Sequence, residues 1–258
     1  MPRSDAPPVP AGSPAVERGV GLFETVLLAG RRPVLWRQHI DRLLRSLTQF
    51  DLPAPSMEEI ESATAAALEN HDETGESALR LTWLAVGSDL ENRGSWRLDA
   101  ALRPIPPATL RRRAGSHAAC LPAAFQRDMP GLKATSYLAC VLGLRYALRR
   151  GCDEAFFVAA DGSCIEGTAT ALLAWNGGGL MASEHLALPG VTAAALAGDT
   201  PPRGTLSRAL LRRGAMVLGS LTKAAPVLTI DGEACLQPPA MRERIEAFNR
   251  SLTEGCFG

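Results

Sequence analysis

The sequence has no surplus of either charge and no long apolar run. Its 27 basic residues match its 27 acidic residues, so the formal net charge is zero. Binding to nucleic acid or to an anionic membrane surface depends on a basic surplus, which this composition does not provide. No apolar stretch approaches the length that crosses a bilayer, and the opening MPRSDAPPVPAGSP lacks the apolar core of a signal peptide. We therefore expect a cytoplasmic protein that binds neither nucleic acid nor membrane.

Cysteine and histidine are present, but without the spacings that metal sites and redox motifs need. The six cysteines include no C-x-x-C pair, and the four histidines show no metal-ligand spacing. The cysteines are interpreted as reduced packing residues of an intracellular protein, and no metal is expected.

Lysine is the residue that the chain most nearly lacks. There are two, Lys133 and Lys223, against 25 arginines. A guanidinium stays protonated, whereas a lysine amine can lose its proton and form an imine with a carbonyl compound. Each lysine is thus a candidate nucleophile, although chance explains the survival of a single lysine equally well.

The stretch 132–173, LKATSYLACVLGLRYALRRGCDEAFFVAADGSCIEGTATALL, contains one of these lysines and a glutamate. Apolar residues at helical spacing, followed by arginines near the end, predict a helix over 134–150. A strand over 155–160 and an Asp-Gly turn signal come next. A hairpin at this turn would return Glu166 towards Lys133.

Alternation, helical spacing and turn residues predict the other elements. Further strands are expected at 20–28, 34–36, 78–86, 95–102, 171–175 and 215–220. Helices are expected at 39–47, 56–70, 205–213 and 241–252, the second of them opened by a Ser56-x-x-Glu59 capping box.

The proline-rich segment RPIPPA (103–108) is the predicted hinge between two domains. We expect a disordered tail over 1–16, a small N-terminal domain over 17–107 and a larger domain over 108–258.

The order of seven motifs resembles that of the class IV aminotransferase family. They are GLFET (21–25), HIDRL (39–43), LRLTW (79–83), LKATSY (132–137), IEGTAT (165–170), LPGVT (188–192) and SLTKAAPVLTIDG (220–232). Members of this family are pyridoxal-phosphate enzymes of fold type IV. The resemblance implies an α+β fold of two domains, the first small and α/β, the second larger, β-rich and cofactor-binding.

The resemblance also implies a role for each matching residue. Lys133 would form an imine with pyridoxal 5'-phosphate and then act as general base, and Glu166 would keep the pyridine nitrogen protonated. The cofactor phosphate would be bound by Arg80, Val191, Thr192 and Ser220. The substrate would lie near Thr25, Tyr137 and Thr222.

Other candidates rank lower in this comparison. Lys223 is the rival lysine, but the family does not form its imine there. His39 and Arg42 are interpreted as structural. Arg97 and Arg103 are candidates only for binding the substrate carboxylate.

The reaction is predicted from finer features of the motifs. F-E-T at 23–25, the short chain and the T-S-Y spacing after Lys133 resemble aminodeoxychorismate lyases, which eliminate pyruvate and leave 4-aminobenzoate, a folate precursor. The alternatives are a branched-chain or D-amino acid transaminase and a catalytically inactive relative. The sequence departs from the family in three places. Ala171 stands where an Asn is usual, and the D-R-x-x-x-G-D-G-like stretch that normally precedes F-E-T is reduced to ERGVGLFET. About a dozen residues are also missing after Thr192. Relatives are homodimers, so a homodimer is expected.

Overall fold

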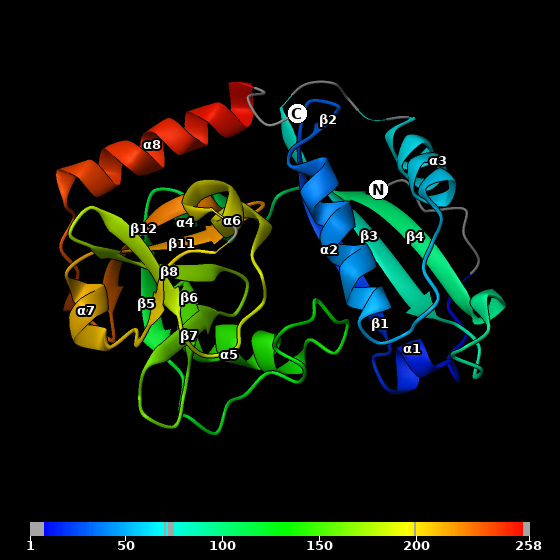
Figure 1. Ribbon diagram of the computed structural model, residues 1–258, viewed down its shortest axis with the longest axis horizontal. Helices are drawn as coiled ribbons and strands as arrows, with labels where there is room; N and C mark the ends of the chain where they lie inside the picture. The colour runs from blue at the N-terminus through cyan, green and yellow to red at the C-terminus, as the bar shows by residue number, and fades with distance from the viewer. Residues whose placement is uncertain (1–7, 70, 72–74, 199, 255–258) are drawn as a thin grey trace. The chain divides into compact units, whose positions relative to one another are not determined.

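The computed structural model describes residues 8–69, 71, 75–198 and 200–254 (Figure 1). The chain divides into two compact units. The first contains the chain up to Ile105 together with Leu132–Tyr137, and the second contains Pro106–Gly131 and the chain from Leu138 onward. The boundary at Ile105 lies within the RPIPPA segment, whereas no sequence signal indicated that 132–137 belongs with the first unit.

The first unit is built on an antiparallel sheet with the strand order β2-β1-β3-β4. Its strands are β1 (Gly21–Ala29), β2 (Arg32–Pro33), β3 (Glu76–Ala85) and β4 (Trp96–Arg103). Its helices are α1 (Pro14–Glu17), α2 (Trp36–Thr48), α3 (Met57–Leu68) and the 3-10 turn Arg93–Ser95. The Ser56–Glu59 capping box of α3 is confirmed, with both of its hydrogen bonds present.

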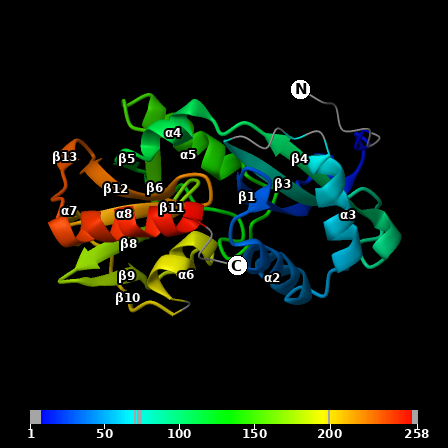
Figure 2. The same cartoon turned by 90° about the horizontal axis from the view of Figure 1, so that it is seen from above.

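Alternation along β1 and β3 sorts their side chains between two faces of this sheet. One face packs on α2 and α3 (Figure 2). The core on this face contains Val26, Leu28, Ile40, Ile60, Leu79 and Leu81. Phe23, Thr25 and Arg80 alternate with these residues, and Thr25 lies directly opposite Arg80 in the β1–β3 register. The sheet therefore presents Phe23, Thr25 and Arg80 together on the face away from the two helices.

One expectation for this unit was wrong. No strand forms at 34–36, because Leu35 adopts a left-handed conformation (φ 56°) as the N-cap of α2, which then begins at Trp36. Within the predicted tail, α1 begins at Pro14 and the side chain of Ser13 is buried. Residues 1–7 of that tail lie outside the described residues, as do Asn70 at the predicted end of the second helix and Cys256.

A buried charge cluster joins β1 to α2. Glu24 accepts hydrogen bonds from Arg42 Nε (2.8 Å) and from His39 Nδ1 (2.7 Å), and Arg42 Nη2 lies 2.6 Å from its second oxygen. A carboxylate only accepts, so the proton of a neutral His39 lies on Nδ1. His39 and Arg42 thus join α2 to β1 through Glu24, which is the contact that a structural role for them requires.

Acid should destabilise the first unit through this cluster. Burial raises the pKa of Glu24, but Arg42 and His39 together outweigh burial and lower it from 4.5 to about 2. Burial disfavours the charged form of His39 and therefore holds the pKa of His39 below its ordinary value of 6.5. The unfolded chain therefore binds more protons than the folded chain, and stability falls as the pH drops below about 6.5 and then from 4.5 towards 2.

Glu24→Gln should lower the free energy of unfolding by about 3–5 kcal/mol, because Arg42 would stay buried without its counter-charge. Urea unfolding measures this change. The Arg212–Glu233 pair is the matched control, since it has the same 2.6 Å N–O distance but is exposed. Glu233→Gln should cost less than about 1 kcal/mol. Equal losses for the two variants would contradict the role given to Glu24.

The second unit is built on a larger mixed sheet with the strand order β10-β9-β8-β11-β12-β5-β6-β7, and β13 pairs with β12. Its strands are β5 (Ser116–Cys120), β6 (Glu154–Val158), β7 (Cys164–Gly167), β8 (Ala171–Asn176), β9 (Gly179–Ser183), β10 (Arg203–Gly204), β11 (Ala215–Gly219), β12 (Lys223–Ile230) and β13 (Glu233–Ala234). Because β7 also contacts β8 and β9, the sheet curls on itself.

Five helices accompany this sheet in the described part of the unit. They are α4 (Pro107–Arg112), α5 (Leu138–Leu148), α6 (Val191–Ala197), α7 (Arg208–Arg212) and α8 (Pro239–Glu254). The terminal helix α8, red in Figure 1, packs on β12. The predicted hairpin is confirmed, since β6 and β7 pair antiparallel and carry Glu166. None of the described helices combines the length and the apolar character needed to cross a membrane.

Candidate functional site

In the first unit, the ring of Phe23 is surrounded by three of the predicted site residues. The Arg80 guanidinium carbon lies 3.7 Å from the ring centroid, and Lys133 Nζ lies 4.6 Å from it. The Tyr137 ring meets Phe23 edge-on, with 5.4 Å between centroids. Thr25 shares this face of the sheet through its register with Arg80. The unit thus gathers an amine, a guanidinium and two hydroxyls around one aromatic ring.

Lys133 is held in this position by its backbone. Its carbonyl accepts a hydrogen bond from the Phe23 amide (2.9 Å), and the Thr135 amide donates to the Gly21 carbonyl (2.9 Å). Ala134 forms an antiparallel bridge with Leu22. Since residues 133–135 pair with β1, the helix predicted from 134 begins only at Leu138.

Arg80 is a half-buried cation. Burial lowers its pKa, and the nearby charge of Arg103 lowers it further. No carboxylate of the described residues forms an ion pair with Arg80. Of the two candidate carboxylate-binding arginines, Arg97 is paired with Asp99 (Nε–Oδ1 2.9 Å), whereas Arg103 is exposed near Arg80. Arg80 and Arg103 together favour an anionic ligand.

In the second unit, Glu166 is a buried carboxylate with a fixed orientation. Arg127 Nη1 lies 2.6 Å from its Oε1, and the Leu188 amide donates to its Oε2 (3.3 Å). Both side chains are almost fully buried, so their attraction is only weakly screened. Sequence reasoning missed Arg127, because nothing in its neighbourhood distinguishes it from 24 other arginines.

Two short segments of this unit carry the other predicted phosphate ligands. Val191 and Thr192 open α6 after Gly190, and the Thr192 side chain is buried. Ser220 lies in the loop between β11 and β12, which Arg113 fixes by donating from Nε (2.9 Å) and Nη2 (2.7 Å) to the Leu221 carbonyl.

The rival lysine and the remaining substrate candidate lie at the end of that loop. Thr222 is buried, and Lys223 begins β12 with a left-handed backbone (φ 61°) and little exposure. The Asn249 side chain exchanges two hydrogen bonds with the backbone of Ala224, at 3.0 and 2.8 Å. Hydrogen bonds therefore fix the backbone both before Lys223, at Leu221, and after it, at Ala224.

The predicted residues fall into two sets, one in each unit. The set of the first unit is Thr25, Arg80, Lys133 and Tyr137; that of the second is Glu166, Val191, Thr192, Ser220 and Thr222. Together they offer an amine, a buried carboxylate, a partly desolvated guanidinium, and hydroxyls beside backbone amides. This donor set fits pyridoxal phosphate, which carries a carbonyl, a pyridine nitrogen and a phosphate.

The chain matches a protein family and a curated protein over most of its length. The amino-transferase class IV family profile matches residues 21–230. Among curated proteins, the chain is 28% identical to the bifunctional aminodeoxychorismate lyase / D-amino acid transaminase of Mycobacterium tuberculosis (strain ATCC 25618 / H37Rv), over 87% of this chain and 86% of that protein.

Solved structures resemble the chain over nearly its whole length. The PLP-bound form of a hypothetical aminotransferase from Mycobacterium tuberculosis has a TM-score of 0.81 at 27% identity, covering 98% of this chain and 96% of that one. The branched-chain aminotransferase of Thermoproteus uzoniensis with norvaline has a TM-score of 0.79 at 26% identity, covering 96% and 90%. The predicted α+β fold of type IV aminotransferases is confirmed.

Proposed function

This chain belongs to the class IV aminotransferase family, whose members are pyridoxal-phosphate-dependent enzymes, and we propose that its reaction is the elimination of pyruvate from 4-amino-4-deoxychorismate. The product left behind would be 4-aminobenzoate. The mycobacterial relative is named for this lyase activity and for D-amino acid transamination, so it supports both reactions. The choice between them therefore rests on features of this chain.

Thr25 is the observation that carries the proposal. Its side chain lies opposite Arg80, on the same face as Phe23, at a position where F-E-G sequences have no side chain. A hydroxyl there narrows the space for an aliphatic side chain and offers a hydrogen bond. That environment suits aminodeoxychorismate, a ring substrate with polar groups, better than a branched aliphatic amino acid.

Lys133 and Glu166 are proposed for the chemical work. When bound, the cofactor supplies an electron sink for the bond that breaks at the amino-bearing carbon of the substrate. Lys133 Nζ would attach the cofactor covalently and, once released by substrate, move the proton. Glu166 would accept a hydrogen bond from the pyridine nitrogen and hold its proton there, while Arg127 keeps the carboxylate oriented.

The remaining residues would bind and orient. Arg80 would bind the phosphate through two parallel hydrogen bonds, supported by the hydroxyls of Thr192 and Ser220 and by the backbone amide of Val191. The hydroxyls of Tyr137, held edge-on against Phe23, and of Thr222 would contact the substrate together with Thr25.

The test is to incubate the cofactor-loaded protein with aminodeoxychorismate and no keto acid. Pyruvate and 4-aminobenzoate should appear together in equal amounts. Thr25→Val, which keeps the shape but removes the hydroxyl, should lower this rate by about 10- to 100-fold, whereas Thr25→Ser should retain it. Amino transfer that requires a keto acid, with no elimination, would show that the transaminase is correct. Neither activity in loaded protein would favour the inactive relative.

We also propose that the chain forms a homodimer, as its resemblance to the family implies. Four large apolar side chains on one stripe of α5 are exposed: Leu138, Val141, Leu142 and Leu148. Such a patch is typical of a surface that is covered in the assembled protein. A second copy would cover it in a symmetric pair.

Light scattering should give a dimer mass for the wild type and a monomer mass for the Val141→Glu, Leu142→Glu double variant. Leu236→Glu is the control, because Leu236 is equally exposed but lies outside this stripe, and it should stay dimeric. A monomeric wild type with intact catalysis would rule out the dimer.

A further inference from the structure

Glu154 is completely buried, yet no step of the proposed reaction uses it. It begins β6, and its carboxylate accepts four hydrogen bonds and forms one ion pair. The partners are the amides of Ala155 (3.0 Å) and Thr168 (3.0 Å), the hydroxyls of Thr168 (2.5 Å) and Thr170 (2.9 Å), and Arg112 Nη1 (3.4 Å). So complete a set of donors fixes the carboxylate in one position.

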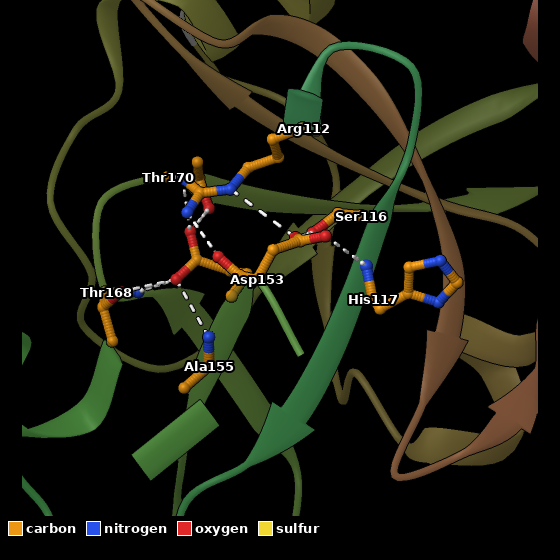
Figure 3. A network of polar contacts seen from close by, with 8 residues as sticks. Arg112, Ser116, His117, Asp153, Ala155, Thr168 and Thr170 are labelled. Carbon is orange, nitrogen blue, oxygen red and sulfur yellow. Dashed lines mark hydrogen bonds and ion pairs between the residues drawn. The ribbon is translucent and has the colours of Figure 1, made fainter. Parts of the chain in front are cut away.

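The cation of this cluster is itself anchored. Arg112 is buried and donates to the backbone carbonyl of Asp153. The Asp153 carboxylate accepts hydrogen bonds from Ser116 Oγ (2.7 Å) and from the amide of His117 (3.2 Å) (Figure 3). The network therefore connects Glu154 to the starts of β5 and β6, which are neighbouring strands of the larger sheet.

Two of the residues bound to Glu154 belong to the turn that directly follows Glu166. Within this turn the Gly167 amide donates to the Thr170 carbonyl (2.8 Å). A Cβ on Gly167 would lie 2.2 Å from Thr170 Oγ1, so the turn closes tightly only with glycine there. Glu154 thus fixes the turn at the end of β7, the strand that carries Glu166.

This turn and Ala171, the residue directly after it, lie against the two segments proposed to bind phosphate. A Cβ built on Gly219, just before Ser220, would lie 3.3 Å from the Ala169 carbonyl oxygen. A Cβ built on Gly190, just before Val191, would lie 3.1 Å from the Ala171 side chain. There is thus no room for a side chain between either glycine and the turn or Ala171, so a shift of the turn would also move both segments.

We propose that Glu154 is a positioning residue for the cofactor. By fixing the turn 167–170 through Thr168 and Thr170, it sets the distance between Glu166 and the phosphate-binding segments. The inference rests on the proposed function for the cofactor and for the role of Glu166. The cofactor would be bound at its pyridine nitrogen and at its phosphate, so its binding would depend on this distance. Displacements of about 1 Å disrupt a pre-organised site.

The experiment measures the binding of pyridoxal phosphate to the full-length apoprotein, and the pH titration of the bound cofactor's absorbance. Thr170→Val removes one donor to Glu154 without changing side-chain shape, and it should raise the Kd for pyridoxal phosphate about tenfold and shift the titration. Thr170→Ser keeps the hydroxyl and should restore both values. Glu154→Gln should have a larger effect than Thr170→Val; if the buried Arg112 then prevents folding, the two Thr170 variants decide.

Ile230→Val is the control for stability alone, since Ile230 is a buried core residue of the same unit. It should lower the melting temperature without changing the Kd or the titration. The inference is overturned if Thr170→Val behaves like Ile230→Val, or if the wild type binds no pyridoxal phosphate. Protein that binds the cofactor but eliminates no pyruvate would reject the lyase proposal and leave this comparison intact.

Discussion

Lys133→Ala should lower the turnover of the cofactor-loaded enzyme by more than about 10⁴-fold, because it removes both the covalent attachment and the proton carrier. Lys133→Arg should be equally inactive although it keeps a positive charge, since a guanidinium does not give up its proton. Both variants should still bind pyridoxal phosphate, because the proposed phosphate ligands do not depend on the amine. Steady-state assays and cofactor titration measure the two effects separately.

Lys223→Arg is the matched control for these variants. Lys223 begins β12 and is nearly buried, so its replacement tests whether any lysine of the chain affects the rate. It should leave the colour of the bound cofactor and the rate constant in place and at most alter substrate affinity. Loss of turnover in Lys223→Arg, with activity retained in Lys133→Arg, would show that the roles are reversed.

Glu166→Gln should lower the rate constant by about 10²–10³-fold, because an amide cannot supply the negative charge that stabilises a protonated pyridine nitrogen. Arg127 would remain beside the neutral amide, 2.6 Å from the position of the lost charge in the wild type. The pyridine nitrogen should therefore lose its proton at a lower pH, which the absorbance of the bound cofactor reports.

Glu184→Gln is the control for this substitution, since Glu184 is an exposed carboxylate of the same unit. It should leave rate and absorbance unchanged. A Glu166→Gln enzyme with wild-type kinetics would mean that another group holds the pyridine nitrogen.

Local signals in the sequence predicted elements of both units. The hairpin that carries Glu166 forms as expected because Asp161-Gly162 is a strong turn signal between two apolar strands. The capping box at Ser56 acts within four residues, and its two hydrogen bonds form as predicted. These elements depend on neighbours in the chain, so a single sequence contains most of the information.

The misses depend on contacts between distant residues. The pairing of 133–135 with β1 joins segments more than 100 positions apart. Because of this pairing, the helix begins four residues later than predicted, at Leu138. Arg127 and Glu154 lie in unremarkable sequence, and their importance follows from burial beside Glu166 and the threonines of its turn. An acidic residue directly before a fully apolar strand was the one available signal for Glu154.

Reduction of the loaded enzyme with borohydride tests the central claim most directly, because it fixes the cofactor to the amine that holds it. Peptide mapping should then find the label in a single peptide that contains Lys133. Label on the peptide that contains Lys223, or a colourless protein that takes up no pyridoxal phosphate, would contradict the account.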